Sequence, residues 1–185
     1  MRLTKVITLA TLAALAAGCQ MDRPSAPASR EAPPQSQPVA QTTAPPTVAP
    51  DKVLASREGA LSNTTFRIDV VQLIRRDRFV NLTFTATVIK TGEVLGWQVH
   101  NAFSAVAKAN PTVDGVFLVD VKNAKKHLVA LDSEGGCVCS RMEGLFLKQD
   151  QTAVFSATFA APPTDVGSVD VHIPNVGTLA NVAIG

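Results

Sequence analysis

The chain contains no tyrosine and a single tryptophan, and charged residues occupy only 17% of its 185 positions, against about a quarter in an average soluble protein. It also lacks an excess of charge of either sign, with 17 Lys and Arg against 15 Asp and Glu. A chain so close to neutral has no strong overall field to attract a polyanion. The sequence therefore predicts no nucleic-acid partner.

The common enzyme signatures are also missing. There is no Gly-x-Ser-x-Gly, no His-Glu-x-x-His, no glycine-rich phosphate loop and no zinc spacing with four ligands. The carboxylate pair Asp132 and Glu134 stands in a polar turn segment, where a solvated loop is the simpler interpretation. We therefore expect a non-enzymatic protein with no cofactor and no catalytic residues.

Two short basic clusters stand out from the otherwise neutral chain. They are Arg75-Arg76-Arg78, next to Asp77, and Lys122-Lys125-Lys126, next to Asp120. Cations with acidic neighbours in short polar segments are typical of solvated turns. The sequence predicts solvated turns at these places, and a basic binding patch is the less favoured alternative.

Residues 1–18 have the composition of an export signal. Arg2 and Lys5 precede the apolar run VITLATLAALAA at residues 6–17. Twelve residues make roughly 18 Å of helix, too short for a bilayer core of about 30 Å. The alternative is a buried core helix, but the run has no polar face and no N-cap. A positive start, a short apolar run and small residues at its end predict a cleaved signal sequence.

The end of this run is more specific. Leu15-Ala16-Ala17-Gly18-Cys19 resembles the lipobox of bacterial lipoproteins, although Ala16 stands where that family most often has Leu. The resemblance implies cleavage before Cys19, a diacylglycerol on its thiol and acylation of the new amino group. Two or three acyl chains suffice for stable anchoring. Loss of Arg2 and Lys5 with the signal would leave equal numbers of basic and acidic residues.

The segment after Cys19 predicts a disordered tether. Residues 20–50 contain eight of the 12 prolines, no aromatic residue and no hydrophobic periodicity. Such a composition cannot bury enough apolar surface to offset the entropy of ordering, and it spans roughly 30 Å as a coil. A docking peptide for proline-binding domains is the other reading. We place the signal at 1–18, the tether at 19–55 and the folded domain at 56–185.

The folded part is dominated by strand patterns. In FVNLTFTATVIK (79–90) apolar residues alternate strictly with polar ones, which predicts a strand with one buried face. In TFRIDVVQLI (65–74) the alternation slips phase after Val70, which indicates a bulge, and residues 75–78 connect the two as a hairpin. The one candidate helix is 101–110, and Trp97 is expected to fill the core. Further short strands are predicted at 94–99, 115–121, 127–131, 152–159, 168–173 and 179–184.

About eight short strands without a long helix predict an all-β, immunoglobulin-like antiparallel sandwich of about 7–8 strands. The stretch LVDVKNAKKHLVALDSEGGCVCS, followed by QTAVFSATFAAPPTDVGSVDVHIP, resembles a domain of exported actinobacterial proteins and is similar in organisation to telokin-like domains of secreted and lipid-anchored bacterial proteins. The resemblance spans roughly residues 60–185. It implies the sandwich and an extracytoplasmic location, and no catalytic residue.

Cys137 and Cys139 carry the most distinctive chemistry of the domain. In an oxidising compartment they are candidates for a disulfide. On an extended strand their Cα atoms would be about 6.7 Å apart, near the limit for a disulfide, so pairing requires a bent backbone, which the preceding glycines permit. Three roles remain open: a weak structural crosslink, a thiol-exchange site with Arg141 nearby, or Cu(I) binding together with Met142 and His127 or His100. The three histidines, including His172, are otherwise expected to be surface or hydrogen-bonded core residues.

These observations favour a lipid-anchored interaction module on the extracytoplasmic face of a membrane. The membrane would be the outer one in a two-membrane bacterium and the plasma membrane in an actinobacterium. The domain is expected to be monomeric and to bind an envelope protein or glycan through loops 91–115 and 132–150, its two longest connections. The alternative is a thiol-redox or copper-handling protein that uses Cys137 and Cys139.

Overall fold

The computed structural model describes residues 52–105 and 111–185, and all strands in these ranges pair antiparallel. The predicted signal, Cys19 and the predicted tether up to residue 51 lie outside the described residues. The described ranges contain no helix with the length and apolar character needed to cross a bilayer. The elements below lie in the predicted domain, except that the first strand begins at Ala55, the last residue of the predicted tether.

The first sheet grows from the strongest alternating segment of the sequence. β3 (Phe79–Thr91) buries one complete face, formed by Val80, Leu82, Phe84, Ala86 and Val88. β2 (Thr64–Arg76) pairs with it as the predicted hairpin, and its register shifts between Val70 and Gln72. The predicted phase slip is thus confirmed as a bulge. β1 (Ala55–Leu61) and β8 (Thr152–Ala160) complete the order β1-β2-β3-β8.

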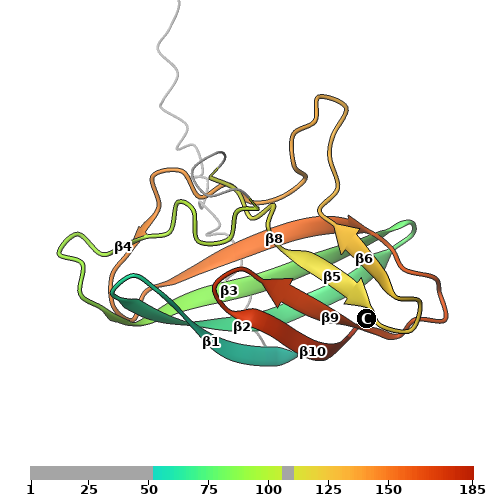
Figure 1. Cartoon of the computed structure of the whole chain (residues 1–185), viewed down its shortest axis with the longest axis horizontal. Helices are drawn as coiled ribbons and strands as arrows, with labels where there is room; N and C mark the ends of the chain where they lie inside the picture. The colour runs from blue at the N-terminus through green and yellow to red at the C-terminus, as the bar shows by residue number, and fades with distance from the viewer. Residues whose placement is uncertain (1–51, 106–110) are drawn as a thin grey trace, which may run out of the picture. The chain divides into compact units, whose positions relative to one another are not determined.

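The second sheet has the order β10-β9-β5-β6 (Figure 1). Its strands are β5 (Phe117–Asp120), β6 (Lys125–Leu128), β9 (Ser168–Ile173) and β10 (Gly177–Ala183). The chain changes sheet between β3 and β5, between β6 and β8, and between β8 and β9. Crossings between two antiparallel sheets are typical of β-sandwiches, the immunoglobulin-like ones included. The predicted all-β fold is confirmed.

The two sheets are also joined by backbone contacts along their margins. On one side Val129, just after β6, forms a bridge with Phe159 of β8. On the other side Gly185 continues from β10 and exchanges hydrogen bonds with β2, donating to the Leu73 carbonyl (2.8 Å) and accepting from the Arg75 amide (2.9 Å). These contacts cover part of the sheet margins, so the length of sheet edge with unpaired backbone groups is reduced.

Next to the first margin, three segments share their hydrogen bonds in a closed ring, which we call the three-way junction. The Ala130 amide donates to the Thr158 carbonyl (2.7 Å), the Thr158 amide to the Val138 carbonyl (3.0 Å), and the Val138 amide to the Ala130 carbonyl (2.8 Å). Because every donor in the ring has a partner, the segments on both sides of the 131–137 hairpin are fixed to β8.

An aromatic cluster occupies the core between the sheets. Trp97 is only 3% exposed and stacks on Phe66 with 4.4 Å between ring centroids, which confirms its predicted core position. Phe103 is fully buried and packs edge to face against all four neighbouring rings, which are those of Phe66, Phe84, Trp97 and Phe155. Since Phe103 and Trp97 come from the connection between β3 and β5, this connection is part of the core.

Two local predictions were wrong. The expected strand at 94–99 shrinks to β4 (Trp97–Gln98), because Val94 and Leu95 form an exposed turn and Gly96 adopts a φ of 91°. An alanine Cβ at residue 96 would lie 2.8 Å from the Leu147 carbonyl oxygen, so only glycine allows this close approach. The expected helix at 101–110 is a turn in its described part, 101–105, and the rest lies outside the described residues.

Candidate functional site

The two longest connections, which the sequence predicts as binding loops, lie side by side. β4 pairs antiparallel with β7 (Phe146–Leu147), so that Trp97 faces Leu147 and Gln98 faces Phe146. We call the surface formed by residues 92–105, 111–116 and 132–150 the loop layer. Figure 1 shows it as the irregular chain along the upper side of the two sheets.

Further backbone contacts hold the loop layer together. Thr112 and Arg141 form an antiparallel bridge, the Val99 amide donates to the Leu145 carbonyl (3.0 Å), and the Val113 amide donates to the Ser140 carbonyl (3.1 Å). Phe103 and Met142 anchor the layer from below, since both side chains are fully buried. The loop layer is therefore a fixed surface with two depressions.

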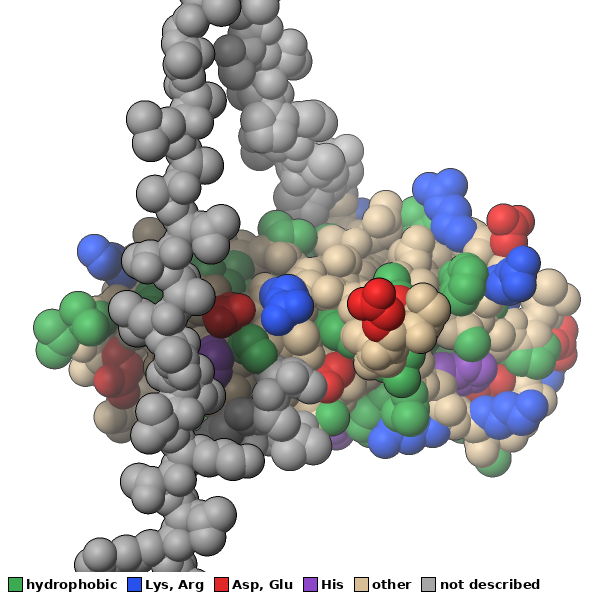
Figure 2. All heavy atoms as spheres, turned by 90° about the horizontal axis from the view of Figure 1, so that it is seen from above, with side chains coloured by type: hydrophobic (Ala, Val, Ile, Leu, Met, Phe, Trp, Pro, Cys, Tyr) green, Lys and Arg blue, Asp and Glu red, His purple; other side chains and the backbone are tan. Residues whose placement is uncertain are grey.

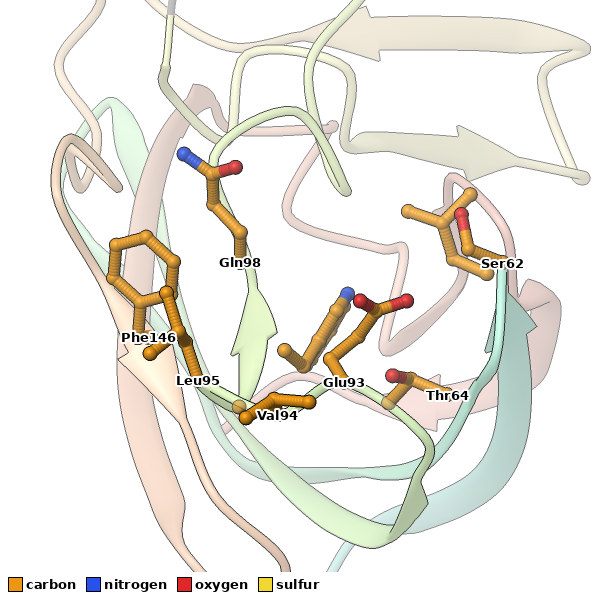
Figure 3. Close-up of a pocket in the computed structure, with 10 residues that line it drawn as sticks. Ser62, Thr64, Glu93, Val94, Leu95, Gln98 and Phe146 are labelled. Carbon is orange, nitrogen blue, oxygen red and sulfur yellow. The ribbon is translucent and has the colours of Figure 1, made fainter.

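The first depression, the apolar groove, has a volume of about 510 Å³ and lies where the loop layer meets the turn between β1 and β2. Figure 3 shows Phe146, Leu95 and Gln98 on one side, Ser62 and Thr64 on the other, and Val94 with Glu93 between them. The buried Trp97 also lines it. The groove thus combines an aromatic wall with a few polar groups, as binding sites commonly do.

Exposed apolar side chains surround this groove. Val94 is 98% exposed, Leu95 is 74% exposed and Phe146 is 44% exposed. Single exposed apolar residues are ordinary, whereas these three line the same groove. The Glu93 carbonyl accepts from the Gly96 amide (3.0 Å), so a tight turn presents Val94 and Leu95 to solvent. This arrangement is suited to binding an apolar partner.

The second depression, the disulfide pocket, has a volume of about 440 Å³ and is mainly polar in its lining. It contains both domain cysteines, the carboxylates of Asp114, Asp132 and Glu134, and Arg141. Asp132 organises its rim, because one carboxylate oxygen accepts from the amides of Glu134 (2.9 Å) and Gly136 (2.8 Å). Asp132 therefore has a structural role in the turn, as the sequence indicates.

Cys137 and Cys139 are joined in a disulfide whose Cα atoms are 5.3 Å apart. The predicted pairing and the bent backbone are both present. The cysteines lie in different bridges: Cys137 faces Leu131 across the hairpin, and Cys139 faces Ala157 of β8. Both are partly buried against the core. The disulfide thus lies beside the three-way junction with one side toward the pocket.

The histidines do not gather around the cysteines as a ligand set. His172 is on β9, where its ring stacks on Phe117, and burial together with Lys126 lowers its pKa below the usual range. His100 and His127 are half-buried, and their Nδ1 and Nε2 atoms, respectively, have no hydrogen-bond partner among the described residues. Within 52–105 and 111–185, no group of three or more His, Cys, Asp or Glu is arranged to hold a metal ion.

Comparison of the chain with protein-family models, with curated proteins and with solved structures finds no match. The site must therefore be interpreted from its own geometry. The structure unites the two predicted loops and pairs the two predicted cysteines. It places Met142 in the core and Cys19 outside the described residues. The exposed pair Val94 and Leu95 was missed because the sequence places both in an apolar run typical of a strand.

Proposed function

We propose that this chain is an exported lipoprotein, anchored through Cys19, whose sandwich binds an envelope partner without catalysis. The observation that supports it best is the union of the two long connections in one fixed surface. Its groove is bordered by the exposed apolar side chains of Val94, Leu95 and Phe146. Exposing apolar area beside a groove is unfavourable unless a partner covers it.

The groove favours an apolar protein segment as partner over a soluble glycan. Apolar and aromatic anchors dominate the centres of protein interfaces, whereas polar groups fix orientation at the rim. The apolar groove has both, with Leu95 and Phe146 on one side and the hydroxyl groups of Ser62 and Thr64 on the other. In this proposal the segment from 20 to 50 serves as a spacer between lipid and domain.

Site-specific photo-crosslinking in the native host tests the binding surface. A photoreactive residue at Leu95 should give a discrete adduct in the envelope, because this side chain is 74% exposed beside the groove. Val154, exposed on the outer face of the first sheet, is the matched control and should give none. Equal adducts at both positions, or none at Leu95, Val94 and Phe146, would refute the proposed surface.

The intact mass of the protein from host membranes tests the anchor. Loss of residues 1–18 and the added mass of two or three acyl chains are expected at Cys19. The Cys19→Ala variant should lack the acyl mass and leave the envelope fraction on mild washing. An uncleaved, unacylated protein in the cytosol would refute export and anchoring together.

A second candidate function uses the disulfide. Cys137 and Cys139 line an open pocket with Arg141, and a nearby guanidinium favours the thiolate. A bond that closes only three residues gains little from chain entropy, which makes a labile, exchanging disulfide physically reasonable. Copper handling would require the reduced pair. Equilibration with glutathione buffers measures the reduction potential of the Cys137–Cys139 disulfide. A potential below about −300 mV supports a structural crosslink, and a clearly higher potential supports thiol exchange.

A further inference from the structure

The two basic clusters of the sequence converge on one end of the sandwich. The segment 161–167, between β8 and β9, receives a contact from each of them. The Arg75 guanidinium donates to the carbonyl oxygens of Pro162 (2.6 Å) and Val166 (3.0 Å), and Lys122 pairs with Asp165. We call this surface, formed by residues 75–79, 121–126 and 161–167, the basic end.

Some cations of the basic end have partners within the domain. Arg75 holds the carbonyl groups just described, Lys122 is neutralised by Asp165, and the Lys126 ammonium lies 3.5 Å from the centroid of the Phe117 ring. These side chains shape the surface and are not expected to bind a ligand.

The remaining three cations, Arg76, Arg78 and Lys125, are exposed and form no ion pair with another described residue. Asp77, in the turn between the two arginines, offsets only one of them. Figure 2 shows Lys and Arg side chains gathered toward this end of the domain. The basic end therefore keeps an excess of positive charge that no internal contact explains.

Exposed apolar side chains accompany these cations. Phe79 follows the arginine turn and is 41% exposed, and Val121 precedes Lys122 and is 67% exposed. Cations attract anionic lipid headgroups, and apolar tips gain from entering the headgroup region. A soluble polyanion would use the charges but would leave Phe79 and Val121 in water. The combination thus favours a lipid surface.

The apolar groove lies at the other end of the domain, and the loop layer along the side of the sandwich carries the opposite charge. β2 runs from Thr64 at the apolar groove to Arg76 at the basic end, a span of about 40 Å at roughly 3.3 Å per residue. The described loop layer carries Arg141 and Lys148 against six carboxylates, which are Glu93, Asp114, Asp132, Glu134, Glu143 and Asp150. An anionic bilayer attracts one end and repels the loop layer.

We infer that the basic end docks on the anionic lipid headgroups of the membrane that holds the anchor, with Arg76, Arg78 and Lys125 as the contacting cations and Phe79 and Val121 at the interface. The apolar groove at the far end of β2 then faces away from the bilayer, toward partners. This inference rests on the proposed lipid anchor. A weak surface suffices, because the anchor keeps the domain at high local concentration beside the bilayer.

The position where the chain joins the sandwich permits this docking. The Leu54 amide donates to the Val70 carbonyl (2.8 Å), about halfway along β2. A spacer that starts there is as close to the basic end as to the groove. The attachment point therefore favours neither the basic end nor the groove, and the positive charge of the basic end determines which of them contacts the lipid.

Vesicle titration of the chain from residue 20 onward isolates this surface from the anchor, since all strands of the described residues lie within 55–183. We expect binding to phosphatidylglycerol vesicles at low salt, none to phosphatidylcholine vesicles, and loss of binding in 0.5 M salt (about 4 Å screening length). Each charge removed should weaken partitioning by about fivefold. The triple variant R76Q/R78Q/K125Q should therefore fall to the phosphatidylcholine level.

A matched triple variant, K52Q/K90Q/K148Q, removes the same charge from other exposed positions and should stay within about twofold of wild type. Equal losses in both triple variants would overturn the docking surface, as would retained binding in R76Q/R78Q/K125Q. If the chain binds duplex DNA as tightly as phosphatidylglycerol vesicles, the basic end binds polyanions in general, and the proposed lipid specificity is wrong. Loss of vesicle binding in V94D/L95D would assign the contact to the groove instead.

The two proposals fail separately. An acylated Cys19 together with no vesicle binding by the unanchored chain refutes the basic end alone. A protein with no acyl mass that still binds phosphatidylglycerol through Arg76, Arg78 and Lys125 refutes the anchor alone.

Discussion

Removal of the Phe103 ring should destabilise the domain more than any loop substitution normally does. Phe103 belongs to a connection, yet it is fully buried and contacts four aromatic rings with centroids between 5.5 and 6.2 Å away. Phe103→Ala therefore removes a core side chain and the main support of the loop layer in one step.

The magnitude follows from burial and cavity formation. Burying a large apolar side chain contributes about 1.5–3 kcal/mol, and each Å³ of void that does not collapse costs about 24 cal/mol more. Rings fixed on β2, β3 and β8 surround the site, so the void can collapse only in part. We expect a loss of about 4 kcal/mol for Phe103→Ala. Phe103→Leu, which keeps most of the volume, should lose about 1.5 kcal/mol.

Urea unfolding followed by the fluorescence of Trp97, the sole tryptophan, measures both values. Because Trp97 contacts Phe103, its fluorescence also responds to the local change, so circular dichroism serves as a second probe. In two-state unfolding the two probes should give the same midpoints. A loss below about 1.5 kcal/mol for Phe103→Ala would show that the connection packs loosely, and the description of the loop layer as a fixed surface would be wrong. A similar loss for both variants would refute the cavity argument.

Three further predictions concern the disulfide, the groove and a buried carboxylate. Replacing both Cys137 and Cys139 by Ser should lower the free energy of unfolding by about 1–2 kcal/mol, since a three-residue loop constrains the unfolded chain little; a loss above about 3 kcal/mol in urea unfolding would contradict this. Gly96→Ala should cost about 1–3 kcal/mol and speed amide exchange in β4 and β7, because φ is 91° there and the added carbon meets the Leu147 carbonyl; unchanged exchange would contradict it. The Asn123 side chain, which donates to Asp120, is the main cause that lowers the Asp120 pKa below 3.8. This stabilisation is therefore present above pH 3.8 and is lost as the pH falls through the lowered pKa, so Asn123→Ala should be less stable than wild type at pH 7, and the difference should shrink as the pH falls below 3.8 in urea unfolding.

Local sequence patterns predict the strands that have one buried and one exposed face. The period-two alternation of β3 identifies its five buried side chains, and the phase slip after Val70 identifies the bulge. The distance argument for Cys137 and Cys139 also holds, because it depends only on the reach of a three-residue segment. These features are predictable since each is determined within a dozen residues.

Other features depend on contacts between distant segments. β1 is a polar edge strand without alternation, and it forms because β2 offers a free edge. The apolar run at Val94 turns away from a strand because Gly96 must pass close to Leu147, a residue about fifty positions later. Arg75 and Lys122 both contact the segment 161–167, and no local sequence pattern predicts this. Pairing between connections, and hence the groove, requires the three-dimensional structure.

The three-way junction has a practical consequence for protein engineering. Ala130 and Val138 are fixed to each other and to Thr158 at the base of the hairpin, whereas its tip from Asp132 to Gly136 is exposed. An epitope or a small ligand-binding peptide could be inserted at the tip without disturbing the sheets, because the base would keep its register. The domain thus offers a rigid scaffold with one natural display position.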